Sequence, residues 1–499
     1  MAEKGDVLQK NDQFHIVRQT DLKRVSLGIV TALIMAGAVL SSAIAFPGNQ
    51  GMTILSIILV PFLLAVFITK NVVDALAIVW LNEMFFGVGG NWIKIGSIPG
   101  RGILLIIVLF MYILFADWKL KLNGRIDKTA LIVIFYGTIF PLGLFFYGTI
   151  VGGATTSNAL SDVMRFSTIL MYFPLRDLFQ HQFDFCFGFL FSSVSILSLL
   201  FVAMAIAPIF IRSVLLINWM SFGDINSQLK GTDLDFFRAG MTPVILCFIG
   251  VFMGIMIYLD SKQSIWRRLF GLFLTCGSTA PFVINFLRGP IVAISFSIFA
   301  LILMFFANKV HRKKSFRLLL LSSVIVVSGY WISVNYLPIS LTKWDVSGQN
   351  LTEILDPARV EQVDRMLDAW LDEPFFGKGV GIPLKDYSRD DSGLAFEVQY
   401  PMVLYRVGLI GFIIIMIPFG WLILRSMRIL VRRDNFLDSL MGKLQVSIAL
   451  SMFTLLISSW ANPYFASAMT PLFFAMFLAL NKIANHNQFN LLNSNKNEK

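Results

Sequence analysis

The sequence predicts an all-α, polytopic integral membrane protein with about 14 transmembrane helices and one large external loop that carries a short amphipathic helix. Of its 499 residues, 56% are hydrophobic, 14% are charged and 48 are phenylalanine. A soluble domain of this size could not cover its surface with so few charges. Apolar runs of about 20 residues, enough to cross a bilayer core of roughly 30 Å, recur from Val25 almost to the C-terminus.

Fourteen apolar runs are expected to cross the membrane. Residues 1–24 are polar and lack the apolar core of a cleavable signal peptide, so the first helix is expected to direct insertion. The run at 157–175 contains Asp162 and Arg165 and is also compatible with an amphipathic helix on the membrane surface. The predicted spans are 25–45, 52–68, 72–89, 102–116, 129–149, 157–175, 184–211, 239–259, 269–287, 290–307, 317–337, 401–424, 444–460 and 464–481.

The distribution of charge orients these spans. The net charge of +11 would suggest nucleic acid in a soluble protein, but here it has to be divided between two membrane faces, and no nucleic-acid partner is expected. With the N-terminus inside, the basic loops at 117–128, 261–268, 308–317 and 425–443 fall in the cytoplasm. The interval 338–400 has six Lys or Arg against twelve Asp or Glu, which places it outside.

With both termini in the cytoplasm, this orientation divides the chain into five parts. They are a cytoplasmic tail (1–24), membrane helices (25–337), the external loop (338–400), further membrane helices (401–481) and a second cytoplasmic tail (482–499). Membrane lipids are therefore expected partners.

The external loop contains a predicted helix. Asp356 followed by Pro357 is typical of a helix start, and Pro374 ends the helix. Its apolar stripe is expected to rest on the membrane helices or the headgroup layer, and consists of Val360, Val363, Leu367, Trp370 and Leu371. Arg365 then faces the other way, where Glu361 and Asp368 lie within pairing distance along the helix.

Three glycines follow this helix within five residues: Gly377, Gly379 and Gly381. Such a segment allows a sharp turn and close approach of the backbone to a ligand. It lacks the flanking strand and helix of a dinucleotide or P-loop site.

Arginines gather on the side that the charge rule makes external: Arg165, Arg212, Arg238, Arg288, Arg359 and Arg365. Arg288 lies in a hairpin between two spans with no carboxylate beside it in sequence. The planar guanidinium suits the oxygens of phosphate, and a lipid-linked phosphate is the one available at this face. The alternative is that these side chains reach lipid headgroups or pair with acids elsewhere in the fold.

Glu397, just before the span at 401–424, is the acid best placed to accept a proton at the membrane surface. The alternative is that Glu397 is a solvated carboxylate at the surface. No metal or cofactor is expected, since Asp390 and Asp391 fit a polar turn and the three cysteines lie in apolar runs. All four histidines map to the cytoplasmic side.

The second half of the chain resembles the O-antigen polymerase and ligase superfamily, specifically the bacterial Wzy-type polysaccharide polymerases. The resemblance covers residues 270–480 and is carried by FLRGP around Arg288, Arg365 with the later DEPFFGKGVG, the loop exit FEVQYPMVLYRVGLIG, and SSWANPYFAS. It implies metal-independent glycosyl transfer between oligosaccharides linked to undecaprenyl diphosphate, with a chain-length regulator and a flippase as possible partners.

The resemblance also implies roles for residues. Arg288 and Arg365 would clamp the leaving diphosphate and Glu397 would take the proton of the attacking hydroxyl. Substrate-binding residues would be Arg359, Arg238, Arg165, Gly377, Gly379, Gly381 and Tyr400. Two alternatives remain. A ligase of the same superfamily usually has a histidine where Glu397 stands, and a flippase would carry its charges along a central cavity.

Overall fold

The described part of the chain is almost entirely helical. The computed structural model describes residues 23–38, 50–86, 94–95, 98–115, 128–206, 245–284, 288–308, 312–323, 357–384, 396, 398–432, 439–460, 467 and 469–497. Within these residues the only strands are β1 (Lys94–Ile95) and β2 (Ile98–Pro99), which pair antiparallel. The predicted all-α class is confirmed for this part.

Several of the described helices are long and apolar enough to cross a membrane. Within the described ranges these are Lys128–Val151, Thr156–Leu200, Gly289–Ala307, Gln399–Arg428 and Leu440–Ser458. Shorter apolar helices lie at Leu59–Thr69, Arg101–Phe115, Cys247–Leu259 and Met469–Ala484. The chain is therefore an α-helical membrane protein, as its composition predicts.

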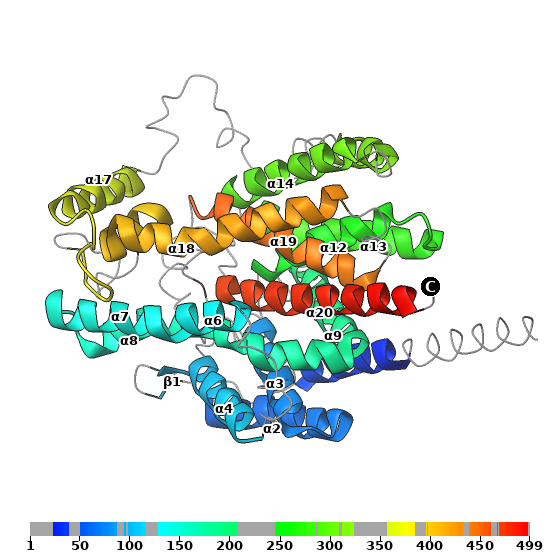
Figure 1. Ribbon diagram of the computed structural model, residues 1–499, viewed down its shortest axis with the longest axis horizontal. Coiled ribbons are helices and arrows are strands. Elements are labelled where there is room, and N and C mark those ends of the chain that lie inside the picture. The colour runs from blue at the N-terminus through cyan, green and yellow to red at the C-terminus, as the bar shows by residue number, and fades with distance from the viewer. Residues whose placement is uncertain are drawn as a thin grey trace, which may run out of the picture.

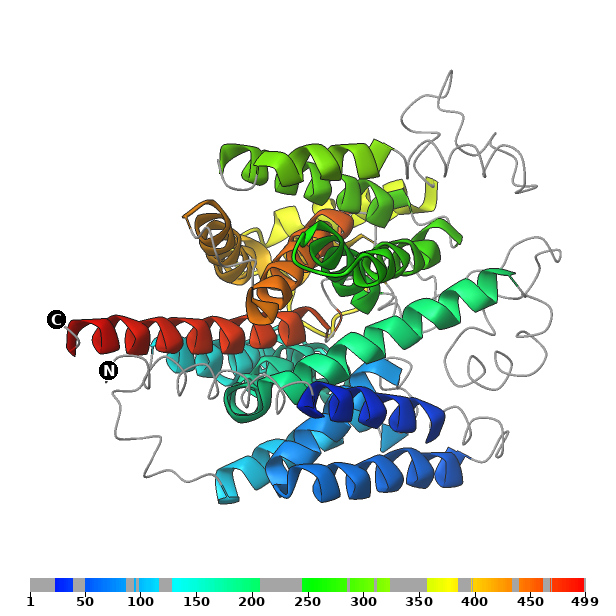
Figure 2. The ribbon, with the colours of Figure 1, turned by 90° about the vertical axis from the view of Figure 1, so that its right-hand side faces the viewer.

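Three helices of the first half form one side of the bundle, in blue in Figures 1 and 2. They are α2 (Gln50–Thr69), α3 (Val72–Phe86) and α4 (Gly100–Phe115), preceded by a helix over residues 23–38. α3 packs against both α2 and α4, and every residue from Val73 to Phe86 is buried. A helix that is covered all round can hold polar side chains that lipid would not tolerate.

The predicted span 129–149 is a helix with two π turns. α6 (Lys128–Ile134) continues through η2 (Phe135–Ile139), α7 (Phe140–Phe146) and η3 (Tyr147–Val151). Each π turn contains a glycine that a neighbouring segment approaches closely. Gly137 meets the side chains of Ile169 and Leu170, and Gly148 meets Val380.

The predicted span 157–175 is an amphipathic helix in its first half, where only Ala159 and Val163 are buried, and it is largely buried from Thr168 onward. α8 (Thr156–Ser167) begins at Thr155, whose hydroxyl accepts a hydrogen bond from the amide of Asn158, and it runs beside α7 (Figure 1). The chain continues through η4 (Thr168–Met171) into α9 (Tyr172–Ile206), which breaks at Gln182. At about 1.5 Å per residue, the stretch Thr156–Leu200 would be more than twice as long as a bilayer core is thick. The break is therefore compatible with the two separate spans, 157–175 and 184–211, that the sequence predicts.

The second half supplies the other side of the bundle (Figure 2). It contains α12 (Cys247–Leu259), α13 (Ile265–Ile284), α14 (Arg288–Ala307), a helix over 312–323, α17 (Pro357–Asp372), α18 (Gln399–Arg432), α19 (Leu440–Ser458) and α20 (Met469–Asn497). α19 lies at the centre, packed against α12, α14, α18 and α20. Its hydroxyls are satisfied within the protein, since Thr454 bonds the carbonyl of Leu450 and also meets Ser297 at 2.6 Å.

α17 starts at Pro357, which confirms the predicted helix start in the external loop. It packs against α18 (Figure 1), and its buried face centres on Gln362 and Met366, both 0% exposed. Leu371, which the sequence places on the apolar stripe, is 63% exposed. The packed face is therefore rotated toward Gln362 relative to the predicted stripe.

α18 is interrupted one third of the way along, at Gly408, where φ is +65°. The segment 374–379 fills the interruption. The amides of Lys378 and Gly379 donate to the carbonyls of Tyr405 and Arg406 (2.8 and 2.9 Å), and the amides of Leu409 and Ile410 donate to Pro374 and Phe375 (2.9 and 3.1 Å). We call residues 374–379 and 405–410 the loop–helix joint. It satisfies backbone groups that a broken helix in a membrane would otherwise leave unpaired.

Replacing Gly408 with alanine should destabilise the protein. The new Cβ would lie 2.3 Å from the carbonyl oxygen of Phe375, in a backbone conformation that L residues rarely adopt. Strain of this kind costs about 1–3 kcal/mol. We expect the midpoint of thermal unfolding in detergent to fall for Gly408→Ala and to stay unchanged for Gly420→Ala, which is in the same helix and has nothing within 4 Å. Equal midpoints for the two variants would contradict the proposed importance of the joint.

Candidate functional site

A buried ion pair lies where α8, α18 and the glycine segment meet. Nη1 of Arg406 in α18 lies 2.7 Å from Oδ2 of Asp162 in α8, and only 8% and 11% of the two side chains are exposed. The same carboxylate oxygen accepts a hydrogen bond from the amide of Gly381 at 3.0 Å. Asp162 thus holds two segments that are far from it in sequence.

Arg406 is enclosed on its other sides as well. Its guanidinium carbon lies 4.8 Å from the centre of the Phe396 ring, within the range of a cation–π contact. Its Nε has no hydrogen-bond partner among the residues that the structure describes. A buried guanidinium nitrogen without a partner is costly and can bind an incoming oxygen or a water.

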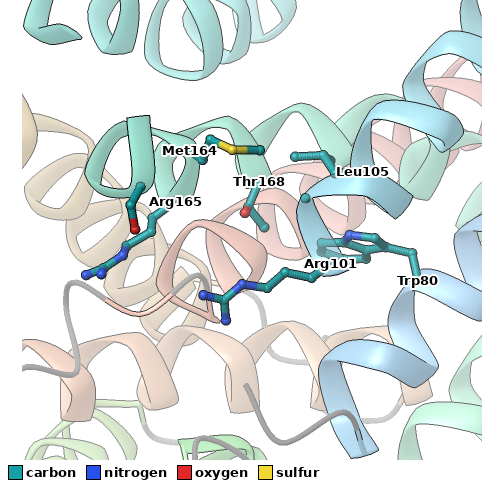
Figure 3. A pocket seen from close by; sticks show the side chains of 8 residues that line it. Trp80, Arg101, Leu105, Met164, Arg165 and Thr168 are labelled. Carbon is teal, nitrogen blue, oxygen red and sulfur yellow. The ribbon is translucent and has the colours of Figure 1, made fainter. Parts of the chain in front are cut away.

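A pocket opens beside this pair, between α3, α4 and α8. It is a small hollow that is partly open to the outside. The lining residues are Trp80, Arg101, Gly102, Leu105, Ser161, Met164, Arg165 and Thr168, and none of them is acidic. Figure 3 shows the guanidinium groups of Arg101 and Arg165 extending toward the same side of the pocket.

The polar groups of the pocket lining are mainly hydrogen-bond donors. Two guanidinium groups, two hydroxyls and the indole of Trp80 line the pocket. A ligand bound there would therefore have to accept hydrogen bonds. Trp80 is 1% exposed, and its Nε1 finds no hydrogen-bond partner within the described residues. Such a lining suits an anion with several oxygens, for which phosphate and diphosphate are the common biological examples.

The charges around the pocket form one connected group. Arg165 interacts electrostatically with Arg101 on one side and with Arg406 on the other, and it lies 3.9 Å from Asp162. Glu83, one helical turn from Trp80, interacts electrostatically with Arg101. Asp162 thus lies between Arg406 and Arg165 and links the buried pair to the pocket.

The three glycines of the external loop contact the chain itself. A Cβ at Gly377 would lie 2.5 Å from the amide of Gly408, one at Gly379 would lie 2.9 Å from Cα of Gly148, and one at Gly381 would lie 2.5 Å from the amide of Ala159. All three have positive φ. The close contacts of these glycines are with the protein's own backbone, and the predicted approach to a ligand stays a prediction.

The side chains of Lys378 and Tyr147 add further contacts to the glycine segment. The ammonium of Lys378 pairs with Asp372 and Glu373 at 3.3 and 3.1 Å, and the hydroxyl of Tyr147 donates to the carbonyl of Gly377 at 3.0 Å. Partial burial opposes the charge of Lys378, but its bonds to the two carboxylates outweigh this and raise its pKa above the ordinary value. Lys378 therefore stays a cation in the physiological range and serves as a tether.

The two arginines predicted on α17 do not line the pocket. Nη2 of Arg365 lies 2.5 Å from Oε1 of Glu361, with 39% and 53% of the side chains exposed. This is the pairing along the helix that the sequence gives as the alternative for Arg365. Arg359, two turns earlier, is half-buried on α17.

The remaining predicted residues fall into two groups. The hydroxyl of Tyr400 donates to the carbonyl of Leu456, and its ring contacts Phe412 and Trp460, so Tyr400 joins α18 to α19. Arg288 is the first residue of α14, and the structure describes its backbone only. Arg212, Arg238, Glu397, Asp390 and Asp391 lie outside the described residues.

The sequence analysis missed Glu83, Arg101 and Arg406. A general signal could have found Glu83 and Arg406, because ionisable residues inside apolar runs mark functional sites in membrane proteins by default. Arg406 even lies within a motif that carries the family resemblance. Arg101 directly follows the turn at Pro99 and Gly100 and has no comparable signal. Across the described residues, no group of three His, Cys, Asp or Glu is placed to hold a metal ion.

Removing one member of the buried pair should cost far more than removing one member of the exposed pair. A buried charge that loses its partner typically costs about 3–5 kcal/mol, whereas an exposed pair contributes about 1 kcal/mol or less. We expect Asp162→Asn to lower the thermal midpoint strongly and Glu361→Gln to leave it nearly unchanged. The double variant Asp162→Asn with Arg406→Met should have a higher thermal midpoint than Asp162→Asn alone, because it no longer buries an unpaired guanidinium. Equal effects of Asp162→Asn and Glu361→Gln would contradict the importance of the buried pair.

The sequence matches no family model and no curated protein. The function is therefore inferred from the chain's own residues, above all from Arg101, Arg165 and Arg406.

Proposed function

We propose that the protein is a membrane glycosyltransferase that joins oligosaccharide repeat units linked to undecaprenyl diphosphate into a polysaccharide. The observation that carries this proposal is the pocket into which Arg101 and Arg165 extend, which is lined by donors and contains no carboxylate. An anionic group is what such a pocket binds, and the chain's apolar surroundings suit an anion that is attached to a lipid.

The proposed reaction is the attack of a sugar hydroxyl on an anomeric carbon. The hydroxyl gives its proton to a carboxylate, for which Glu397 is the proposed acceptor, and its oxygen bonds to the anomeric carbon. The bond from that carbon to the lipid diphosphate breaks, and the diphosphate leaves with the electron pair. Negative charge then accumulates on the diphosphate, where guanidinium groups fixed in advance stabilise the transition state.

The roles of residues combine the resemblance with the geometry. From the resemblance, Arg288 and Arg365 are proposed to clamp the diphosphate, with Arg359 and Arg238 in support. The geometry adds Arg101 and Arg165 as pocket arginines. Arg406 is proposed to set the position of α8, and thus of Arg165, through its pair with Asp162.

The proposed membrane arrangement places this pocket on the outer side. Fourteen spans with both termini in the cytoplasm put the start of α4, the start of α8 and the start of α18 at the outer face. Arg101 and Arg406 lie within the first turns of α4 and α18, and Arg165 lies in the third and last turn of α8. A lipid-linked oligosaccharide outside the cytoplasmic membrane would reach them from that side.

A flippase is the alternative of a different class, and one observation bears on it. A second polar group lies at the start of α3, near the end of α4 and in the first third of α9, where Gln182 bonds Asp74 and the hydroxyl of Tyr112 donates to Asp177 at 2.8 Å. Along α3 the two groups are separated by the buried apolar residues 75–79. A continuous polar path, which a flippase needs, does not run along this helix, so polymerase is favoured. A ligase shares the proposed site and differs only in its acceptor.

The polymerase proposal is tested by incubating purified protein in liposomes with lipid-diphosphate-linked repeat units and separating the products by size. A ladder with release of lipid diphosphate is expected. Loss of one electrostatic donor typically slows such steps by about 10²–10³-fold, so Arg101→Gln and Arg165→Gln should each abolish the ladder. Arg267→Gln, an exposed arginine at the opposite end of the bundle, is the matched control and should keep it. Lipid movement across the bilayer without a ladder would favour the flippase.

The proposed orientation is tested with cysteines placed on the two sides. In a variant without the three native cysteines, Ser388→Cys in the external loop should react with a membrane-impermeant maleimide added to intact cells. Ser264→Cys, exposed in the turn between α12 and α13, should react only after the membrane is permeabilised. Labelling of Ser264→Cys but not of Ser388→Cys in intact cells would reverse the orientation.

A further inference from the structure

The loop–helix joint carries two large apolar side chains on its surface. Phe375 and Phe376 are 60% and 61% exposed, and Leu371, in the last turn of α17, is 63% exposed. Large apolar side chains that gather on a surface mark a place of interaction. The segment belongs to the loop that the charge pattern places outside the membrane, so its surroundings have to be determined from its contacts.

Both phenylalanines lie against membrane spans. The ring centre of Phe376 lies 6.2 Å from that of Tyr147 in η3, and the carbonyl of Phe375 accepts a hydrogen bond from the amide of Ile410 in α18 at 3.1 Å. Tyr147 and Ile410 belong to helices that are long and apolar enough to cross a membrane. Figure 1 shows α17 at the same end of the bundle as the start of α18. The two rings therefore lie beside the ends of these spans.

The depth of Tyr147 follows from the length of its span. The span begins at Lys128, and Tyr147 is its twentieth residue. A hydrocarbon core of roughly 30 Å takes about 20 helical residues, so Tyr147 falls at the outer edge of the core. Its contacts agree with this depth, because the ring meets Phe376 while the hydroxyl donates to the carbonyl of Gly377 at 3.0 Å. A tyrosine with one apolar and one polar side is typical of the membrane–water boundary.

The lipid-facing surface of the two spans continues into the phenylalanines. The spans are neighbours, since the hydroxyl of Tyr136 donates to the carbonyl of Ile414 at 2.6 Å. No charged residue occurs in 129–151 or in 407–424. Large apolar side chains are exposed along both spans, among them Ile139, Leu142, Phe146, Ile410, Ile413 and Ile417. Phe375 and Phe376 thus extend a surface that lipid has to cover.

Charged side chains lie directly beside this apolar pair. Asp372 and Glu373, at the end of α17, are 71% and 45% exposed and share the ammonium of Lys378 at 3.3 and 3.1 Å. An apolar surface bordered by charges of both signs suits the boundary between acyl chains and headgroups, where each kind of group finds its own surroundings.

We propose that Phe375 and Phe376 insert into the bilayer and seat the loop–helix joint in the outer leaflet, among the acyl chains of phospholipids. This seat also fixes the depth of the charged site, because Gly381, five residues after Phe376, donates to Asp162, which pairs with Arg406. The inference does not depend on the proposed reaction. It uses the proposed orientation only to name the leaflet.

Exposed aromatic rings at an external site can instead stack on sugar rings. The two occupants differ in what surrounds the rings in the absence of substrate, which is acyl chains for a membrane seat and water for an empty sugar site. A fluorophore at the position of Phe376 distinguishes them.

The test attaches a fluorophore to Phe376→Cys in a full-length variant without the native cysteines, in phospholipid nanodiscs. Quenching is measured with iodide in the water and with nitroxides at several depths along the lipid chains. We expect nitroxides to quench and iodide to have no effect, with a depth about 5–10 Å below the headgroup surface. Asp364→Cys, exposed on α17, is the control and should be quenched by iodide only. Ile139→Cys, in the middle of its span, should respond to the deepest nitroxides.

Quenching of the label on Phe376→Cys by iodide, with no effect of nitroxide lipids, would overturn the membrane seat. If lipid-diphosphate-linked oligosaccharide then removed that iodide quenching, the rings would belong to a sugar site. Phe375→Cys repeats the measurement at the second exposed ring and should report a similar depth, and a native gel-filtration profile shows that each labelled variant is folded. Because the measurement needs no substrate, its failure would leave the proposed polymerase activity untouched.

Discussion

The loop–helix joint is the interaction on which the neighbouring charged site depends. A helix that is interrupted inside a membrane exposes carbonyls and amides that lipid cannot satisfy. Here residues 374–379 supply both the missing donors and the missing acceptors. This exchange places Gly381 against Asp162, and Asp162 in turn holds Arg406. The need to satisfy the backbone of α18 at its interruption thus determines where the side chains of Asp162 and Arg406 meet.

One carboxylate organises the charges gathered there. Asp162 is shared by Arg406, by Arg165 and by a backbone amide. Burying charges is tolerated only when partners compensate for lost hydration. The donors of the neighbouring pocket lining, Arg101 and Arg165 among them, favour an anion at that place.

Local signals in the sequence were sufficient for the helices but not for the site. Pro357 marked the start of α17, and the apolar runs marked α2, α3, α4, α14 and α19 within a few residues, whereas α18 continues to Arg432, eight residues beyond the predicted span. The glycine segment was recognised as a place of close approach, but its partner was not, because Gly408 and Ala159 are distant in sequence. The pairing of Asp162 with Arg406 joins two helices through the fold alone, and no spacing rule connects them. Glu83 and Arg101 are likewise neighbours only after α3 and α4 have packed.

The distance along the chain between Asp162 and Arg406 also matters during synthesis. Arg406 follows Asp162 by about 240 residues, which ribosomes make in roughly 12–50 s at about 5–20 residues per second. For that time the carboxylate of α8 is in or near the bilayer without its final partner. Arg165, one turn away on the same helix at 3.9 Å, is available from the start. The arginine that later faces the pocket can thus serve first as a temporary counterion that makes the insertion of α8 less costly.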